Sequence, residues 1–346
     1  MSIEEEIRRI EEEIRRTQYN KATEHHIGRL KAKLARLKQE LQKRKKVGGR
    51  VEGIKKSGDA SVAITGPPFT GKSTLVKVLT GVEEEASSYK PPKAVPAMLK
   101  YKGAEIQLID LPGITKNSLR GKLREVYQVL RWVDLIVVVV DPYTQDMEKE
   151  VLNEIREIGV RPGENEPDIY LEEKSSGGIV IRSTVEQELE EATIRKILRE
   201  FGVINGEIIL REKVTIDRLI DFLAGNRVYV PYITIMNKAD EGGDHNFKIS
   251  ALQGTNIEEF KEKLFRELNL IRVFLKPPGK EADMENPMIL RAGNTVEDLC
   301  KRLHRNFIKN FRYAQVWGKS VKFPGQRVGL SHTLQDGDIV SIVVRR

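Results

Sequence analysis

Apolar residues recur with a helical period at the start of the chain. Isoleucine or leucine stands at every third or fourth position in two stripes, which places each stripe on one face of a helix. The first stripe is Ile3, Ile7, Ile10 and Ile14, and the second is Ile27, Leu30, Leu34, Leu37 and Leu41. The polar segment TQYNKAT between them offers Asn20 and Thr23 as helix caps. We therefore expect an antiparallel helical hairpin over residues 1–50.

Short continuous apolar runs replace the helical stripes further along. After a Gly/Ser linker the runs are SVAITG at 61–66, EIQLID at 105–110, LIVVVVD at 135–141 and YVPYITIMN at 229–237. Runs of this length, with helical stretches between them, are typical of strands buried in a parallel sheet with helices on its faces. The pattern predicts an α/β domain in two parts, 51–157 and 227–270.

The segment between the third and fourth of these strands is too long for one crossover helix. Residues 158–226 contain Pro/Gly punctuation, strand candidates GIVIR and GEIILR, and helix candidates at 184–201 and 216–223. We expect an inserted α+β module beside the sheet. After Leu270, the run IRVFLKPPG, a helix over 295–311 and the pieces AQVWG and DIVSIVV predict a compact strand-rich domain over 271–346.

Composition favours a soluble globular protein with two or three domains. The chain has 346 residues, of which 39% are hydrophobic, and its longest strongly apolar run, 135–140, is too short to cross a membrane. The N-terminus is charged, unlike a signal sequence, and the lone Cys300 lies in a helical pattern typical of packing. We expect a cytoplasmic protein.

Positive charge is concentrated at the two ends of the chain. Residues 1–50 carry 15 Lys/Arg and 8 Asp/Glu, residues 271–346 carry 14 and 7, and the remaining middle sums to −6 within a total of +8. Basic flanks predict contact with a polyanion such as RNA, although a solvated surface that only maintains solubility fits the charge equally well. The candidate contacts in the first flank are Lys31, Lys33, Arg36, Lys43, Arg44, Lys45 and Lys46.

The stretch GPPFTGKST at 66–74 has the spacing of a phosphate-binding loop between a strand and a helix. Its backbone N–H groups can surround a β-phosphate, the Lys72 ammonium can neutralise phosphate oxygens, and the Ser73 hydroxyl can bind Mg²⁺. The predicted phosphate-binding residues are Gly66, Phe69, Thr70, Gly71, Lys72, Ser73 and Thr74.

The motif DLPG ends the strand that follows this loop. Asp110 would hold Mg²⁺ through a water, and the N–H of Gly113 would meet a γ-phosphate. Gly113 and Lys72 are therefore the catalytic candidates, and Ser73 and Asp110 are the metal candidates.

Two later motifs predict the recognition of a guanine base. In NKAD at 237–240, which begins with Asn237, the carboxylate of Asp240 can accept two hydrogen bonds from guanine, and Lys238 would lie over the base. In the triplet Ser250, Ala251 and Leu252, the Ala251 N–H would meet the guanine carbonyl. This pattern favours GTP and GDP over adenine nucleotides.

With these motifs the chain resembles the developmentally regulated GTP-binding (DRG) proteins, Obg-related translation-factor GTPases. The stretches that carry the resemblance are NKATEHHIGRLKAKLARLKQEL, VPAMLKYKGAEIQLIDLPGI, GNRVYVP, TVEDLC and YAQVWGKSVK. The resemblance implies a P-loop NTPase G domain with GTPase activity, an N-terminal helical hairpin, an insertion like the second domain of ribosomal protein S5, and a C-terminal TGS domain with a β-grasp fold. It also implies association with the ribosome and, in eukaryotic members, a stabilising partner protein. We expect a monomer.

Three positions depart from the pattern that this resemblance implies for catalysis. The threonine-rich switch I corresponds to SSYKPPKAVPA, which has no threonine between Ser87 and Pro96. Ile114 stands where Ras-like enzymes carry a water-orienting glutamine, and Phe69 cannot supply the oxygen ligand expected for a K⁺ ion. We therefore expect slow intrinsic hydrolysis with Mg²⁺, and K⁺ as a cofactor is disfavoured.

Two other functions stay open at this point. The altered switch I favours a ribosome- or RNA-binding adaptor in which guanine nucleotide is a structural ligand. An ATPase, as in the OBG-like subgroup, is disfavoured by Asp240. In the last domain, Trp317 and Tyr313 can either stack on bases or pack the domain edge.

Overall fold

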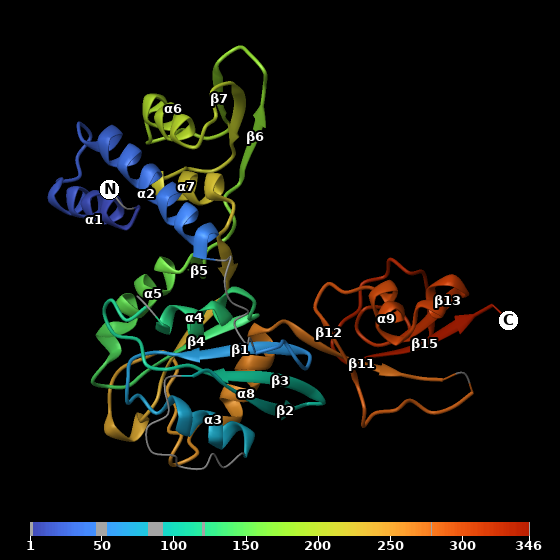
Figure 1. Cartoon of the computed structure of the whole chain (residues 1–346). Helices are drawn as coiled ribbons and strands as arrows, with labels where there is room; N and C mark the ends of the chain where they lie inside the picture. Colours follow the sequence, from blue (N-terminus) through green and yellow to red (C-terminus); the bar gives the residue numbers. More distant parts are fainter. Residues whose placement is uncertain (1–2, 46–53, 82–92, 120–121, 278, 346) are drawn as a thin grey trace. The chain divides into compact units, whose positions relative to one another are not determined.

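The chain forms two compact units. The computed structural model describes residues 3–45, 54–81, 93–119, 122–277 and 279–345 (Figure 1). The first unit combines residues 1–53 with 159–229, and the second combines 54–158 with 230–346. Among the described residues, every helix is too short or too polar to span a bilayer.

The first unit contains the two predicted N-terminal helices, α1 (Ile3–Arg16) and α2 (Glu24–Lys45). Their connection is fixed by reciprocal bonds, because the Thr23 N–H donates to Asn20 Oδ1 over 2.9 Å and the Asn20 N–H donates to Thr23 Oγ1 over 3.0 Å. An ion pair of 2.6 Å joins Glu6 on α1 to Lys33 on α2.

The inserted module supplies the rest of the first unit. Its strands and helices are β5 (Val160–Pro162), β6 (Ile169–Glu173), β7 (Ile179–Ser183), α6 (Glu191–Glu200), β8 (Gly206–Leu210), α7 (Ile216–Ala224) and β9 (Val228–Val230). One sheet has the order β6-β8-β7, and β5 pairs with β9. Helix α2 packs on this module, because Ala32 is fully buried in the same cluster as Ile194 and Ile197 of α6.

The predicted helix over 184–201 begins only at Glu191. The Gln187 side chain explains the difference, because it donates to Glu212 O over 2.7 Å and accepts from the Val214 N–H over 2.9 Å. These bonds hold the segment before α6 as a loop against the connection between β8 and α7. Strand β6 was not predicted, because its sequence IYLEE ends in two glutamates and lacks the continuous apolar run IVI of β7.

The second unit contains the predicted α/β domain. Its strands are β1 (Ala60–Thr65), β2 (Val95–Tyr101), β3 (Ala104–Asp110), β4 (Leu135–Val140) and β10 (Tyr232–Met236), in the order β10-β4-β1-β3-β2. All neighbours are parallel except β2, which pairs antiparallel with β3. The apolar run at 229–237 divides between β9 and β10, at Pro231.

Helices cover both faces of this sheet (Figure 1). They are α3 (Lys72–Thr80), α4 (Lys122–Val126), α5 (Glu148–Glu157) and α8 (Ile257–Glu267), with short 3₁₀ turns at Tyr127–Arg131, Gln145–Met147 and Ala239–Glu241. Leu75 of α3 and Phe260 of α8 share one buried cluster with Val62 and Val137 of the sheet. The strands therefore end at a common edge between helices, where the loops that carry the motifs emerge.

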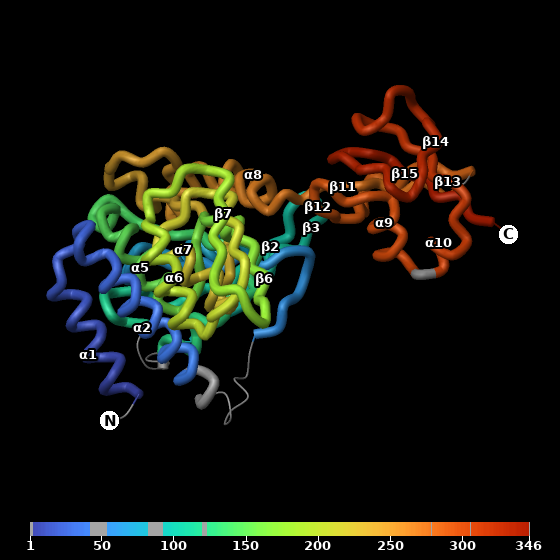
Figure 2. The backbone as a smooth tube through the Cα atoms, turned by 90° about the horizontal axis from the view of Figure 1, so that it is seen from above, coloured from blue at the N-terminus to red at the C-terminus, as the bar shows by residue number. Residues whose placement is uncertain are grey.

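The C-terminal domain is a second mixed sheet. Its elements are β11 (Leu270–Leu275), β12 (Met288–Arg291), α9 (Val296–Leu303), α10 (Arg305–Lys309), β13 (Phe311–Trp317), β14 (Gln326–Val328) and β15 (Asp338–Val344). The order is β12-β11-β15-β13-β14, with β11 and β15 parallel. Figure 2 shows α9 and α10 to one side of β13 and β15.

The helix predicted over 295–311 is two helices. A capping box between Thr295 and Asp298 starts α9, and His304 adopts an extended backbone (φ −171°, ψ 144°) that ends it. Cys300 is fully buried on α9, in the cluster formed by Val296, Leu299 and the sheet. It is a packing residue, as the sequence indicated.

Candidate nucleotide-binding site

The loop after β1 wraps around the N-terminus of α3. Gly66 has φ +140°, and a Cβ there would lie 2.1 Å from the Val139 carbonyl oxygen of β4. Gly71 has φ +82°, and a Cβ there would lie 2.4 Å from Asn237 Nδ2. Both positions therefore require glycine. Between them Thr70 is fully buried, and Phe69 lies 93% exposed with its backbone in the left-handed region (φ +66°).

Lys72 lies inside this loop with only 6% of its surface exposed. Its Nζ donates to the Pro67 carbonyl oxygen over 2.5 Å. Burial lowers the pKa of Lys72 to about 8, although the charges of Asp110 and Asp141 oppose the shift. The ammonium is thus held by a backbone carbonyl at the position where the motif expects phosphate oxygens. Thr74 follows it in the first turn of α3.

The two predicted metal candidates lie side by side. The Ser73 hydroxyl donates to Asp110 Oδ2 over 2.5 Å, because β1 and β3 are parallel neighbours and their loops leave the same edge of the sheet. Hydroxyl and carboxylate oxygens are the ligand type that Mg²⁺ takes alongside substrate phosphates. The described residues contain no cluster of three or more His, Cys, Asp or Glu that would hold a metal ion by itself.

The DLPG segment is packed against the phosphate loop. A Cβ on Gly113 would lie 2.8 Å from Pro68 Cα, and the Ile114 N–H donates to the Gly66 carbonyl over 3.0 Å. Ile114 is fully buried. This contact places Gly113 beside the phosphate loop and removes the Ile114 side chain from solvent.

Tyr127 anchors the same segment, and the sequence did not reveal it. Its hydroxyl donates to the Pro112 carbonyl and lies 3.0 Å from Thr65 Oγ1 at the end of β1. The ring is fully buried, and burial raises the pKa of the phenol above its usual range. A tyrosine in a short helical segment carries no motif, so no sequence signal identifies this role.

Asn237 joins the phosphate loop to the base-recognition loop. Its Nδ2 donates to the Thr70 carbonyl over 2.9 Å, and its Oδ1 accepts from the Ala251 N–H over 3.0 Å. We expected the Ala251 N–H to meet guanine. In the structure this N–H donates to Asn237 Oδ1, and this hydrogen bond holds the two loops together.

Lys238 forms a partly buried ion pair that the sequence did not predict. Its Nζ donates to Asp141 Oδ2 over 2.8 Å, and Asp141 also accepts from Thr144 Oγ1 over 2.7 Å. Burial alone would raise the pKa of Asp141, but the bonds from Lys238 and Thr144 outweigh it and lower that pKa. The carboxylate at the end of β4 therefore fixes the Lys238 side chain next to the expected base.

Asp240 is exposed at the end of this loop. The hydroxyl of Ser250 hydrogen-bonds its carboxylate and lowers the pKa of Asp240, so the group is ionised at neutral pH. Leu252, two residues after Ser250, is 83% exposed. The structure thus brings Asn237, Lys238, Asp240 and the 250–252 loop to one end of the phosphate loop.

Three of the predicted RNA-contacting residues on α2 bond to other groups of the first unit. Lys31 pairs with Asp217 at 2.8 Å, Lys33 pairs with Glu6, and Arg36 donates to the Glu200 carbonyl over 2.7 Å. Asp217 and the Glu200 carbonyl belong to the inserted module and Glu6 belongs to α1, so all three cations have partners within this unit. Their contact with a phosphate backbone stays a prediction. Lys46 and the side chains of Lys43, Arg44 and Lys45 lie outside the described residues, as does the switch I segment up to Pro92.

Comparison with known proteins agrees with this geometry. Family models match residues 61–174 ("50S ribosome-binding GTPase"), 176–270 ("C-terminal region of MMR_HSR1 domain") and 271–344 ("TGS domain"). The chain is therefore a guanine-nucleotide-binding P-loop GTPase with a C-terminal TGS domain. It belongs to the developmentally regulated GTP-binding protein family.

The relatives match along nearly their whole length. An uncharacterized GTP-binding protein of Methanocaldococcus jannaschii is 46% identical, with 100% of this chain and 94% of that protein covered. Developmentally-regulated GTP-binding protein 2 of Homo sapiens is 39% identical, with 99% and 100% covered. A crystal structure of Era with MgGDPNP and a segment of 16S ribosomal RNA superposes with a TM-score of 0.33 at 19% identity, over 60% of this chain and 56% of that one.

Proposed function

We propose that the protein is a regulatory GTPase with slow intrinsic hydrolysis whose nucleotide state governs its engagement with the ribosome. The observation that carries the proposal is the bridge made by Asn237 between Thr70 and Ala251. Through this one side chain, the loop that would bind phosphates and the loop that would bind the base are held in a fixed relation. When a nucleotide is bound at both ends, a change between GTP and GDP at the phosphate loop can then alter the base-recognition loop as well.

The phosphate end has the groups for charge neutralisation. Lys72 would exchange the Pro67 carbonyl for phosphate oxygens, and Ser73 with Asp110 would hold Mg²⁺. The ion supplies positive charge to the phosphates when it is bound. K⁺ is disfavoured as a further cofactor, because Phe69 offers no side-chain oxygen at the loop position where a ligand is expected.

Slow hydrolysis follows from what stands beside Gly113. The next residue, Ile114, is apolar and fully buried, so it can neither donate to nor accept from an attacking water. Orienting that water is a main contribution of the protein in GTPases, because phosphoryl transfer depends on position and charge. The water must then be held by backbone groups or by a partner, and turnover without that partner is slow.

Engagement of the ribosome is the partner proposal. Its support is the match of residues 61–174 to the family of 50S ribosome-binding GTPases, together with the net charge of +7 over residues 271–346. The remaining cations of residues 1–50 contribute to the same attraction. The proposed setting is the cytoplasm, with the chain as a monomer and with a further stabilising protein as a second partner.

Single-turnover hydrolysis tests the enzyme proposal. Stripped protein is loaded with γ-labelled GTP and Mg²⁺, and phosphate release is followed with and without ribosomes and K⁺. We expect slow release that ribosomes accelerate, and release at the background rate from Lys72→Ala. No release above that background in any condition contradicts the proposal.

A structural role for the nucleotide is the alternative. The observation that favours it is the absence of threonine between Ser87 and Pro96. Calorimetry with GDP and with a non-hydrolysable GTP analogue separates the two functions. A regulatory GTPase changes its affinity for ribosomes between the two nucleotides, whereas an adaptor with a fixed ligand does not.

A further inference from the structure

The C-terminal domain has one sheet face that its helices leave uncovered. Ala314 and Val316 of β13 and Val340 of β15 point into the buried cluster that includes α9. Because side chains alternate along a strand, Tyr313, Gln315 and Trp317 point to the opposite face. The register aligns Tyr313 with Val343 and Gln315 with Ser341, so both strands present these residues together.

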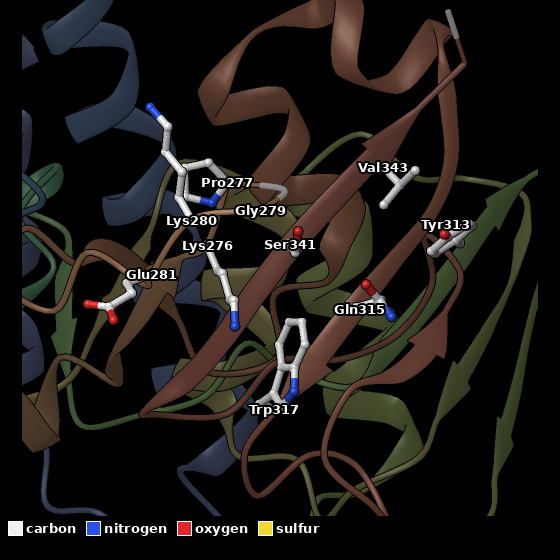
Figure 3. Close-up of a pocket in the computed structure, with 10 residues that line it drawn as sticks. All are labelled: Lys276, Pro277, Gly279, Lys280, Glu281, Tyr313, Gln315, Trp317, Ser341 and Val343. Atoms are coloured by element: carbon white, nitrogen blue, oxygen red, sulfur yellow. The ribbon is translucent and has the colours of Figure 1, made fainter.

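This face is hollowed into a cavity of about 670 Å³. Figure 3 shows Trp317, Gln315 and Tyr313 following one another along β13, with Ser341 beside them and Lys276 reaching toward Trp317. Lys280 and Glu281 line it from the segment after β11. The floor thus has an aromatic ring near each end and an amide between them.

Cations surround the two rings. The Lys276 ammonium lies 4.8 Å from the centre of the Trp317 ring, and the Arg327 guanidinium lies 4.6 Å from that of Tyr313. Arg312 approaches Tyr313 from its own strand at 5.8 Å. Within the described part of the chain, Lys276 and Arg327 contact these rings, and neither they nor Lys280 form an ion pair with a carboxylate. Their charge is therefore available to a ligand, and Glu281 is the one acid among the lining residues.

We propose that this face, formed by Tyr313, Gln315, Trp317, Lys276, Lys280 and Arg327, binds single-stranded RNA by stacking bases on its two aromatic rings. Aromatic platforms inside a basic groove are the arrangement that binds unpaired nucleotides, because every base offers a ring face and every linkage a phosphate. The Gln315 amide can hydrogen-bond a base edge between the rings. A duplex does not fit this chemistry, because its bases are already stacked. The inference names the surface and the RNA for the proposed ribosome engagement, on which it rests.

Fluorescence polarisation of a labelled single-stranded RNA of about 12 nucleotides with the full chain tests the proposal at about 0.15 M salt. We expect Trp317→Ala to weaken binding roughly 5- to 150-fold, the range that loss of one stacked base produces. Trp317→Phe keeps a ring and is expected to stay within a few-fold of the parent. Lys276→Ala removes one cation of the face and should lower the slope of log affinity against log salt by about 0.7. Its matched control is Lys309→Ala on α10, which should leave that slope unchanged.

Thermal unfolding followed by circular dichroism shows whether each variant is folded, because the C-terminal domain has a core of its own. If Trp317→Ala is not folded, Tyr313→Ala, which removes the other ring of the same face, takes its place with the same expected loss of RNA binding. Equal RNA binding by Trp317→Ala and the parent overturns the proposal, and so does duplex RNA that binds as tightly as the single strand. A polyglutamate peptide that binds this face when RNA does not assigns it to an acidic protein instead. If the parent protein binds no single-stranded RNA but still co-sediments with ribosomes, this surface assignment alone is refuted. A parent protein that binds neither also refutes the partner proposal.

Discussion

Burial of a single cation, Lys72, makes nucleotide binding depend on pH. Its pKa in the free protein is about 8, against an ordinary value of 10.5. The free-energy cost of burying the charged form is therefore full below pH 8 and disappears as the pH rises to 10.5. The free energy of unfolding of the free protein increases with pH over that window. Phosphate oxygens favour the charged form, so a bound nucleotide raises the pKa again.

We expect the affinity for GDP to fall about tenfold per pH unit above pH 8, with uptake of nearly one proton on binding near pH 9. Calorimetry in two buffers of different ionisation enthalpy measures that proton. Lys72→Arg serves as the control, because a guanidinium stays charged over this range. Affinity that is flat between about pH 7.5 and 9.5 in the parent protein rules out this linkage.

The Tyr127 hydroxyl is expected to stabilise the DLPG segment. Tyr127→Phe leaves the Pro112 carbonyl and the Thr65 hydroxyl without this partner, and we expect the free energy of unfolding to fall by about 1–2 kcal/mol. Urea unfolding followed by tryptophan fluorescence measures it. Tyr143→Phe is the matched control, since Tyr143 is 77% exposed. Equal midpoints for the two variants would show that the Tyr127 bonds contribute nothing.

Residues inside motifs could be placed from the sequence, and residues that support them could not. The spacing of Gly66, Gly71 and Lys72 is local, so it fixes a loop geometry by itself. Tyr127 contacts Pro112 and Thr65, and Asp141 accepts a hydrogen bond from Lys238, all of them distant in the chain. Their roles depend on how strands and helices pack, which no short pattern encodes.

Among the elements, α2 is a packing helix more than an exposed basic rod. Ala32 is fully buried against α6, and a Cβ on Gly28 would lie 3.1 Å from Thr193 Cγ2. The period of its leucines predicted a helix correctly, but the small residues on its other face were not recognised as a contact surface. That face is matched by the apolar side of α6, more than 150 positions away.

We expect Ala32→Leu to destabilise the first unit by about 1–3 kcal/mol, because extra methyl groups have no space at this contact. Urea unfolding followed by circular dichroism measures the loss. Ala22→Leu makes the same chemical change at an exposed position and should have little effect. GDP binding, which the second unit performs, should be unchanged in both variants. A stability for Ala32→Leu equal to that of Ala22→Leu contradicts the packing described here.

The predicted bounds of helices were wrong where one side chain or one backbone conformation ended the helix. The extended His304 divides a helical pattern that continues on both sides of it. Gln187 holds seven residues before α6 out of the helix. Strands with few buried positions, such as β6 and β14, were missed because half-exposed strands lack the apolar runs that mark β1 and β4.

At the scale of the whole molecule, the basic residues divide into those that are bonded to other groups of the protein and those that can contact a ligand. Deleting residues 1–50 would also remove Ala32 from a buried cluster, so point variants are the better test of ribosome binding. We expect Lys276→Ala with Arg327→Ala to reduce ribosome co-sedimentation at about 0.15 M salt. Lys31→Ala with Arg36→Ala removes the same charge from internally bonded positions and should have a smaller effect. A larger loss of co-sedimentation from Lys31→Ala with Arg36→Ala than from Lys276→Ala with Arg327→Ala contradicts the assignment of the binding surface.

The central claim is that one pocket holds a guanine nucleotide by its phosphates and selects its base through Asp240. The most direct measurement is calorimetry of nucleotide-stripped protein with GDP and ADP, alongside Asp240→Asn. We predict saturable binding of GDP at one site, ADP weaker by roughly 100-fold or more, and a loss of that preference in Asp240→Asn. No saturable uptake of GDP, or equal affinity for GDP and ADP in the parent protein, would contradict the account.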